Sequence, residues 1–150
     1  MSEYDVLRTR KGTVMKKQSR TEARCEAFKL IFQAETNFDD MEFLIQHMWE
    51  EHPETFSNID YIRKCALGVV EKKEELEADI SANLSSSWTI SRISKVSLCV
   101  LKLALFEIKY MDDVPEKVAV NEAVELEKTY DEPDNSAFVN GVLGGFLKKR

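Results

Sequence analysis

Basic side chains near the N-terminus are the first residues whose type and spacing could do chemistry. Four cations lie there, with the two arginines on one face of a predicted helix: Lys16, Lys17, Arg20 and Arg24. Cations beside a helix N-terminus, where backbone N–H groups are free, attract phosphate. The alternative is structural, because arginine stems can cover the edge of a core while their charged ends stay in water. This segment alone leaves both interpretations open.

The C-terminal stretch SAFVNGVLGGFLKKR carries an aromatic ring and an amide inside an apolar helical pattern. Asn140 offers a donor and an acceptor, which suits reading a base edge or fixing a neighbouring loop. Phe138 is either an anchor in the core or a platform on which an unpaired base stacks. Gly141 and Gly144 lie with Ala137 away from the apolar stripe, where small residues let a ligand or a second backbone come close.

Patterns typical of catalysis are missing from the sequence. His47 and His52 are five residues apart and have no cysteine nearby, which is unlike a metal-binding pair. No glycine-rich loop joins a strand to a helix, and the carboxylates of residues 71–77 alternate with lysines on a solvated helix face. We therefore expect a binding protein rather than an enzyme, with no metal and no cofactor.

Charge is unevenly distributed along the chain, whose net value is −6. Residues 1–24 hold seven basic and three acidic side chains, and the remainder holds 14 basic and 24 acidic ones. This asymmetry suggests a phosphate-binding arm on an acidic body, although a solvated tail without function has the same composition. The three cysteines are far apart in apolar patterns, which indicates reduced thiols in a cytoplasmic protein. No apolar run is long enough to cross a membrane, and no secretory signal is present.

The elements that must position these residues are all helical. Ser19 and Glu22 have the spacing of a capping box, which predicts a helix from there to about Ala34. The stretch VSLCVLKLALFEIKY is apolar nearly all round and should be the most buried helix. Apolar periodicity and helix-start signals predict the remaining elements: helices over 38–51, 59–84, 96–110, 115–130 and 136–150, and a short turn over 90–93.

These elements predict an all-α fold of about seven helices in two small packed bundles. We expect residues 1–18 to form a flexible basic extension, because they have little apolar content or periodicity. Residues 19–150 then form the helical body, with an N-terminal bundle of about 19–84 and a C-terminal bundle of about 88–150. The serine run at 85–87 marks the division.

The segments VPEKVAVNEAVELEKTY and SAFVNGVLGG resemble the signature of the NusB family of bacterial transcription antitermination factors. The start of the first helix and the segment LKLALFEIKY are similar to the family as well. The resemblance implies an all-helical fold of two small bundles. It also implies binding of boxA, a short element in the leader RNA of ribosomal RNA operons, together with the small-subunit ribosomal protein NusE. The resulting complex joins transcribing RNA polymerase and suppresses termination.

Carried over residue by residue, the resemblance adds Lys128 and Tyr130 to the RNA surface formed by the arginines, Phe138 and Asn140. It places a NusE-facing segment at Ser91, Ser97 and Glu107. The two serines stand where relatives commonly have acidic residues. Thr21 and Glu22 stand where family members often have consecutive arginines, and Lys16 and Lys17 are the candidate replacements.

Asp134 precedes Phe138, where a negative charge opposes nearby phosphates, so we expect it to weaken RNA affinity. Two alternatives to RNA binding remain open. The helical body could be a protein-interaction or homodimerisation module that uses the glycine face of the last helix. It could also target an enzyme on another chain to RNA, because NusB-like domains occur fused to RNA methyltransferases.

Overall fold

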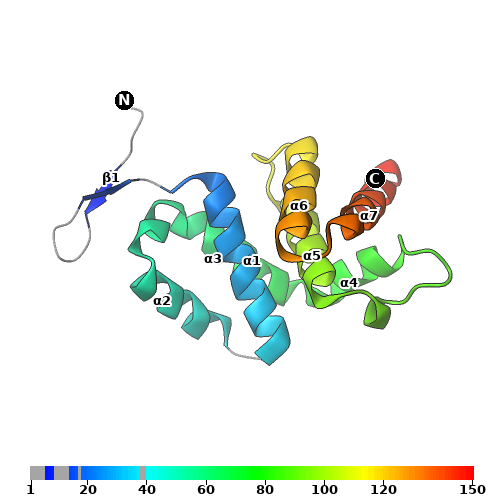
Figure 1. The fold of residues 1–150 in the computed structure, drawn as a ribbon, viewed down its shortest axis with the longest axis horizontal. Helices are drawn as coiled ribbons and strands as arrows, with labels where there is room; N and C mark the ends of the chain where they lie inside the picture. Colours follow the sequence, from blue (N-terminus) through cyan, green and yellow to red (C-terminus); the bar gives the residue numbers. More distant parts are fainter. Residues whose placement is uncertain (1–5, 9–13, 17, 38–39) are drawn as a thin grey trace. The chain divides into compact units, whose positions relative to one another are not determined.

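The computed structural model describes residues 6–8, 14–16, 18–37 and 40–150, the strands by their backbone alone. Helices account for most of this part of the chain, which confirms the all-α class (Figure 1). The helices are α1 (Arg20–Asn37), α2 (Met41–Glu51), α3 (Ile59–Glu71), α4 (Lys73–Ser81), α5 (Lys95–Tyr110), α6 (Glu116–Tyr130) and α7 (Ser136–Lys148). Three short 3-10 turns complete them: η1 (Pro53–Asn58), η2 (Ile90–Arg92) and η3 (Pro133–Asn135). No helix among the described residues is long and apolar enough to span a membrane.

A short hairpin precedes the helices. β1 (Val6–Arg8) and β2 (Val14–Lys16) pair antiparallel, with Leu7 opposite Met15. The sequence analysis found no strand pattern here, because three-residue strands are too short to display a clear alternation. Lys16 is therefore the last residue of a strand, and the predicted site residue Lys17 lies outside the described residues.

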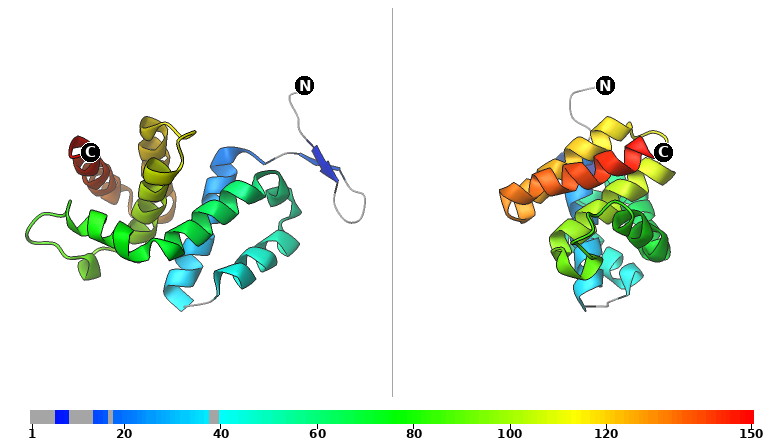
Figure 2. Two further views of the ribbon diagram at one scale, coloured as in Figure 1. Left: turned by 180° about the vertical axis from the view of Figure 1, so that it is seen from behind. Right: turned by 90° about the vertical axis from the view of Figure 1, so that its right-hand side faces the viewer.

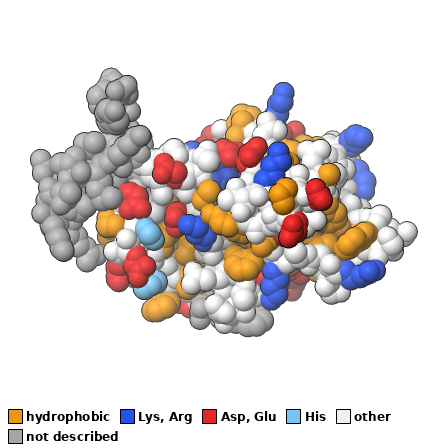
Figure 3. Space-filling view, in the orientation of Figure 1, with side chains coloured by type: hydrophobic (Ala, Val, Ile, Leu, Met, Phe, Trp, Pro, Cys, Tyr) orange, Lys and Arg blue, Asp and Glu red, His pale blue; other side chains and the backbone are white. Residues whose placement is uncertain are grey.

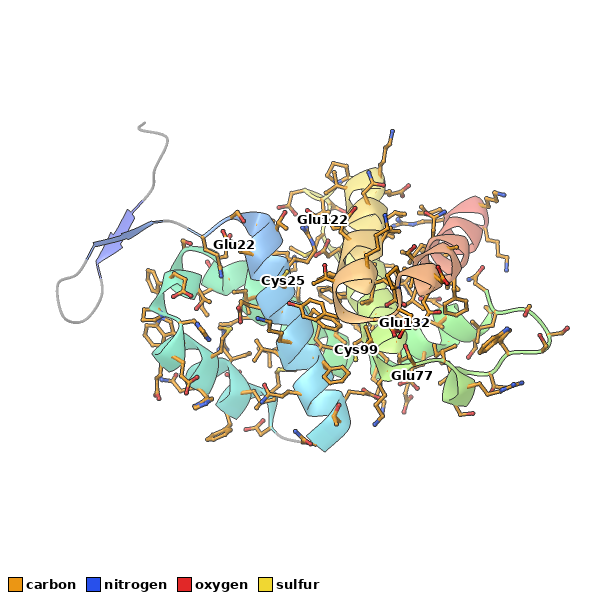
Figure 4. The ribbon with its side chains drawn as sticks, in the orientation of Figure 1. Glu22, Cys25, Glu77, Cys99, Glu122 and Glu132 are labelled. Atoms are coloured by element: carbon orange, nitrogen blue, oxygen red, sulfur yellow. The ribbon has the colours of Figure 1, made fainter. Side chains whose placement is uncertain are left out.

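The N-terminal unit ends at Leu67, so its helical part comprises α1, α2, η1 and the first two and a half turns of α3. The predicted capping box begins α1: the Ser19 N–H donates to Glu22 Oε1 at 2.9 Å, and the Glu22 N–H donates to Ser19 Oγ at 3.1 Å. Figure 4 labels Glu22 at this end of the helix. Apolar side chains at helical spacing on each helix form the core of the unit: Ala23, Ala27, Ile31, Leu44, Ile45, Met48, Ile62 and Ala66.

The C-terminal unit, residues 68–150, is built around α5. Every α5 side chain from Ser97 to Ile108 is buried, which confirms that this apolar stretch is the most buried helix. Helices α4, α6 and α7 pack against it, and α6 and α7 form a helical hairpin closed by η3 (Figure 2). Lys102 is buried as well, with Nζ 2.7 Å from a carboxylate oxygen of Glu77, which Figure 4 labels on α4.

The chain divides between Leu67 and Gly68, inside α3, whereas the sequence analysis put the division at the serine run 85–87. The predicted helix over 59–84 is two helices, because Lys72 leaves helical geometry at φ −97°, ψ 19°. Beyond this break, α4 buries Leu76 and Ile80 and packs against α5 and α7. Burial against C-terminal helices therefore assigns α4 to the second unit. The serine run at 85–87 breaks the helical periodicity, but a local break does not show against which helices α4 packs.

Candidate nucleic-acid interface

At the start of α1, the two predicted arginines lie beside one aromatic ring. The Arg20 guanidinium carbon is 4.2 Å from the centroid of the Tyr61 ring, and that of Arg24 is 5.6 Å away. Arg20 is exposed and its Nε donates to Asn58 Oδ1 at 3.4 Å. Arg24 is only 3% exposed. Arg20 therefore stays a candidate phosphate contact. Arg24 is corrected, because its side chain is buried, and it does not match the structural alternative either, since that alternative keeps the charged end in water.

Asn58, at the end of η1, organises this corner. Its Nδ2 donates to the Gln18 backbone carbonyl at 2.9 Å, and its Oδ1 accepts from Arg20. Both contacts join residues about 40 positions apart, so η1 fixes where the chain enters α1. Sequence reasoning missed this role, because the contacts are with residues far away in the chain.

In the C-terminal unit, Phe138 lies in the first turn of α7 and is only partly buried. Its ring centroid is 6.0 Å from that of Trp88, with the ring planes at 42°. The Trp88 side chain is 44% exposed. Phe138 is therefore partly buried against a ring that lies at the surface, and its role as a stacking platform stays a prediction.

The remaining predicted RNA residues of this unit lie at the same end of the α6–α7 hairpin. Lys128 and Tyr130 are exposed in the last turn of α6, and Asn140 is exposed on α7. Asp134 is exposed in η3 between the two helices. Cationic, aromatic, amide and acidic side chains therefore gather around one helical connection.

The glycines of α7 lie in different surroundings. A Cβ on Gly145 would lie 2.9 Å from Asn83 Oδ1, so α7 closely approaches the turn that follows α4. A Cβ on Gly141 or Gly144 would meet no atom within 4 Å. The packing of the chain itself therefore explains Gly145 and leaves a smooth, open face at the other two positions.

A partly buried cluster of two carboxylates and two serines ties the start of α5 to the end of α6. Ser97 Oγ donates to Glu127 Oε2, and Ser94 Oγ donates to Asp131 Oδ2 at 2.6 Å. Burial raises the pKa of Glu127 to about 7; the Ser97 hydroxyl opposes the rise and the Asp131 charge adds to it. Burial also acts to raise the pKa of Asp131, but hydrogen bonds from Ser94 and other donors outweigh it and lower that pKa. Sequence reasoning missed this cluster, because both carboxylates lie in an acidic helix pattern typical of a solvated face.

The predicted partner-facing residues do not share a surface. Ser97 is 2% exposed and Glu107 is 1% exposed, so both lie inside the fold and are corrected as docking residues. Ser91 is exposed in η2, with its hydroxyl 3.1 Å from that of Thr89. Sequence spacing could not tell the buried Ser97 and Glu107 from the exposed Ser91. The burial of α5 on every side depends on the helices packed around it, which the spacing within α5 does not show.

Acidic and basic side chains are interspersed over the face drawn in Figure 3. No group of three His, Cys, Asp or Glu side chains within the described part of the chain is arranged to hold a metal ion. Together, these observations define a small, predominantly helical protein of two compact units that exposes cationic and aromatic side chains.

The sequence comparisons agree on the family. The model described as "NusB family" matches residues 21–148. The transcription antitermination protein NusB of Clostridium novyi (strain NT) is 38% identical over 132 residues, covering 87% of this chain and 98% of that protein. The NusB of Listeria monocytogenes serotype 4a (strain HCC23) is 41% identical over 124 residues, covering 83% and 92%. The chain belongs to the NusB family of transcription antitermination proteins.

Solved structures support the same fold. Thermotoga maritima NusB ("T. maritima NusB, P3121, Form 2") has a TM-score of 0.78 at 29% identity, covering 89% of this chain and 94% of that one. The solution structure of NusB from Aquifex aeolicus has a TM-score of 0.72 at 25% identity, covering 86% and 87%. A structure described as antitermination factors NusB and NusE in complex with dsRNA has a TM-score of 0.78 at 24% identity, covering 87% and 97%, and this likeness bears on the fold alone.

Proposed function

We propose that this protein binds a boxA-type single-stranded RNA of ribosomal RNA operon leaders, together with NusE, and that the complex joins RNA polymerase in the cytoplasm to suppress termination. Membership of the NusB family supports the proposal. The observation that carries it is that the partly buried Phe138 lies at one helical connection with the exposed side chains of Asn140, Lys128 and Tyr130. Single-stranded RNA is recognised by this combination of cations for the backbone with aromatic and amide groups for splayed bases.

Arg20 supplies the cationic contact from the N-terminal unit in this proposal. Its guanidinium stays exposed while Tyr61 supports one side of it, which limits the side-chain freedom lost on binding phosphate. Lys16 is a further phosphate contact in the proposal, as is Lys17, and Ser91 is the remaining candidate for a contact with NusE.

A titration of boxA-type RNA against a scrambled RNA, each with and without NusE, tests the proposal directly. Tighter binding of boxA than of the scrambled RNA, with a further gain from NusE, is the expected result. Equal binding of the two RNAs in both conditions contradicts it.

Salt dependence tests the role of Arg20. For a single strand, log affinity falls with log salt by about 0.7 per phosphate contact. Arg20→Ala should therefore lower the slope by about 0.7. Arg63→Ala is the matched control, because Arg63 is an arginine of the same unit that already pairs with Glu42 at 2.9 Å. An unchanged slope in Arg20→Ala removes that residue from the site.

A second candidate function is homodimerisation through α7. The open face at Gly141 and Gly144 favours it, since a helix backbone of a second copy could approach closely there. Sedimentation distinguishes the two functions: a dimerisation module forms a concentration-dependent dimer that is indifferent to RNA.

A further inference from the structure

The loop between α4 and α5 holds two exposed side chains that the proposed function does not use, although both belong to the middle segment that is similar to the family. They are Trp88 and Arg92, with the Arg92 guanidinium carbon 5.4 Å from the centroid of the Trp88 ring. We propose that Trp88 and Arg92 form, with Phe138, a stacking site for one unpaired nucleobase of a bound RNA strand. This inference rests on the proposed function and extends it to residues of the α4–α5 loop.

The exposure of Trp88 is the first step of the argument. A tryptophan ring left 44% exposed forgoes much of the stabilisation that its burial would supply. Phe138 packs beside it at 6.0 Å, so the two rings form one aromatic surface that joins the α4–α5 loop to the first turn of α7. An aromatic surface of this kind is what successive or unpaired bases stack on.

Arg92 adds a fixed cation to this surface. Its Nη1 donates to the Ser87 carbonyl at 2.9 Å, which holds the guanidinium over the ring and closes the loop between residues 87 and 92. A guanidinium stacks on aromatic faces and binds phosphate with its remaining N–H groups. Base and backbone of one nucleotide could therefore be held by neighbouring side chains.

The charge of the surrounding sequence favours a polyanion as the occupant. The chain has 27 Asp and Glu residues, yet residues 82–95, which run from the end of α4 to the start of α5, contain none of them. The same stretch has exposed cations at Arg92 and Lys95 and five serine or threonine hydroxyls between residues 85 and 91. An acidic peptide would also be attracted by the cations, but it has no base to stack on the aromatic pair. A nucleotide strand offers phosphates to the cations and bases to the rings.

Tryptophan fluorescence tests the inference, because the chain has only two tryptophans. Trp49→Phe leaves Trp88 as the sole emitter, and Trp88→Phe leaves Trp49, which lies in the N-terminal unit beside Phe56. Titration with boxA-type RNA should quench the Trp49→Phe protein at the concentrations where labelled RNA binds by anisotropy. The Trp88→Phe protein should stay nearly unquenched.

Affinity variants complete the test. Trp88→Ala should weaken RNA binding by about 5- to 100-fold, the usual range for one base–aromatic stack, while Trp88→Phe keeps most of the affinity. Arg92→Ala should also weaken binding, and Arg92→Lys should restore only part of it, because an ammonium does not stack. Circular dichroism of each variant verifies the fold, and the fluorescence titration keeps the test valid if Trp88→Ala does not fold.

The outcomes separate this inference from the function on which it rests. RNA binding with no Trp88 quenching and no loss in Trp88→Ala overturns the stacking site and leaves the proposed function standing. Failure of the unmodified protein to bind RNA, alone and with NusE, overturns both. A loss of NusE binding in the absence of RNA, with RNA affinity unchanged, overturns the stacking site in favour of a protein contact.

Discussion

Glu127 is the residue whose environment departs most from what its sequence neighbours suggest. It lies in the pattern NEAVELEK, where carboxylates commonly face water, yet its side chain is fully buried. One carboxylate oxygen accepts from Ser97, and the other has no hydrogen-bond partner. Burying an ionised carboxylate in this state costs free energy, so the folded protein favours the protonated form.

The pH dependence of stability follows from that preference. Burial raises the pKa of Glu127 from 4.5 to about 7, so the group stabilises the fold fully below pH 4.5, and this contribution is lost as pH rises through 7. Glu127→Gln removes the titration. Relative to wild type, its free energy of unfolding should rise between pH 5 and 8 by up to about 3 kcal/mol. Denaturant unfolding at several pH values measures the difference.

Glu125→Gln is the matched control, because Glu125 is exposed on the same helix. The free energy of unfolding of Glu125→Gln should differ from that of wild type by the same amount at every pH. A pH-independent difference for Glu127→Gln as well would mean that this carboxylate is ionised in the folded protein throughout the range.

Sequence reasoning succeeded at residues whose role is local and failed where the role depends on packing. Ser19 and Glu22 are three positions apart and cap one helix, so their spacing alone predicted both hydrogen bonds. Arg24 and Ser97 were assigned to surfaces, although both are buried. Their burial is decided by Tyr61 and Glu127, which are about 30 or more positions away, and no pattern within a helix reports such contacts.

At the scale of elements, helix packing explains why a glycine stands inside α3, which the apolar pattern of that helix does not explain. Gly68 lies in α3, and a Cβ there would be 2.2 Å from ring atoms of Phe106 on α5. The two helices therefore approach closely at this point. Most of the helices were predictable because amphipathic periodicity persists over several turns. The break at Lys72 was not, because neither glycine nor proline marks it.

Gly68→Ala and Gly141→Ala form a matched pair that separates helix propensity from packing. Both replace a helical glycine by the best helix former, which alone would stabilise by about 1 kcal/mol. Gly68→Ala should instead destabilise by about 1–3 kcal/mol, because Phe106 must move. Gly141→Ala should show the full gain, since its Cβ meets no atom within 4 Å. Denaturant unfolding measures the change in the free energy of unfolding for each variant. Stabilisation by Gly68→Ala would contradict the close approach of the two helices.

At the scale of the whole molecule, the proposed function requires a chain with a net charge of −6 to bind a polyanion. The unevenness of the charge reconciles the two. Residues 1–24 hold seven basic and three acidic side chains, and residues 82–95 have no acidic side chain. Long-range repulsion from the body is screened within about 8–10 Å at physiological salt. The charges near a bound phosphate therefore matter more than the net charge does.

Asp134 tests whether local or total charge controls RNA affinity. It is exposed in η3, just before the helix that carries Phe138 and Asn140. Asp134→Asn should strengthen RNA binding, because it removes a negative charge beside the proposed phosphate path. The gain should shrink as salt rises. Loss of an acidic residue near the α7 N-terminus should also lower the free energy of unfolding by about 0.3–1 kcal/mol.

Asp113→Asn is the control that makes the comparison decisive. Asp113 is exposed between α5 and α6, remote in sequence from η3, and its replacement changes the net charge by the same amount. If local charge governs binding, Asp134→Asn binds boxA-type RNA more tightly than wild type and Asp113→Asn does not. If both variants gain RNA affinity equally, the total charge of the protein determines that affinity. No gain from Asp134→Asn would place the bound strand away from η3, and the assignment of Phe138 and Asn140 to the RNA surface would then fail with it.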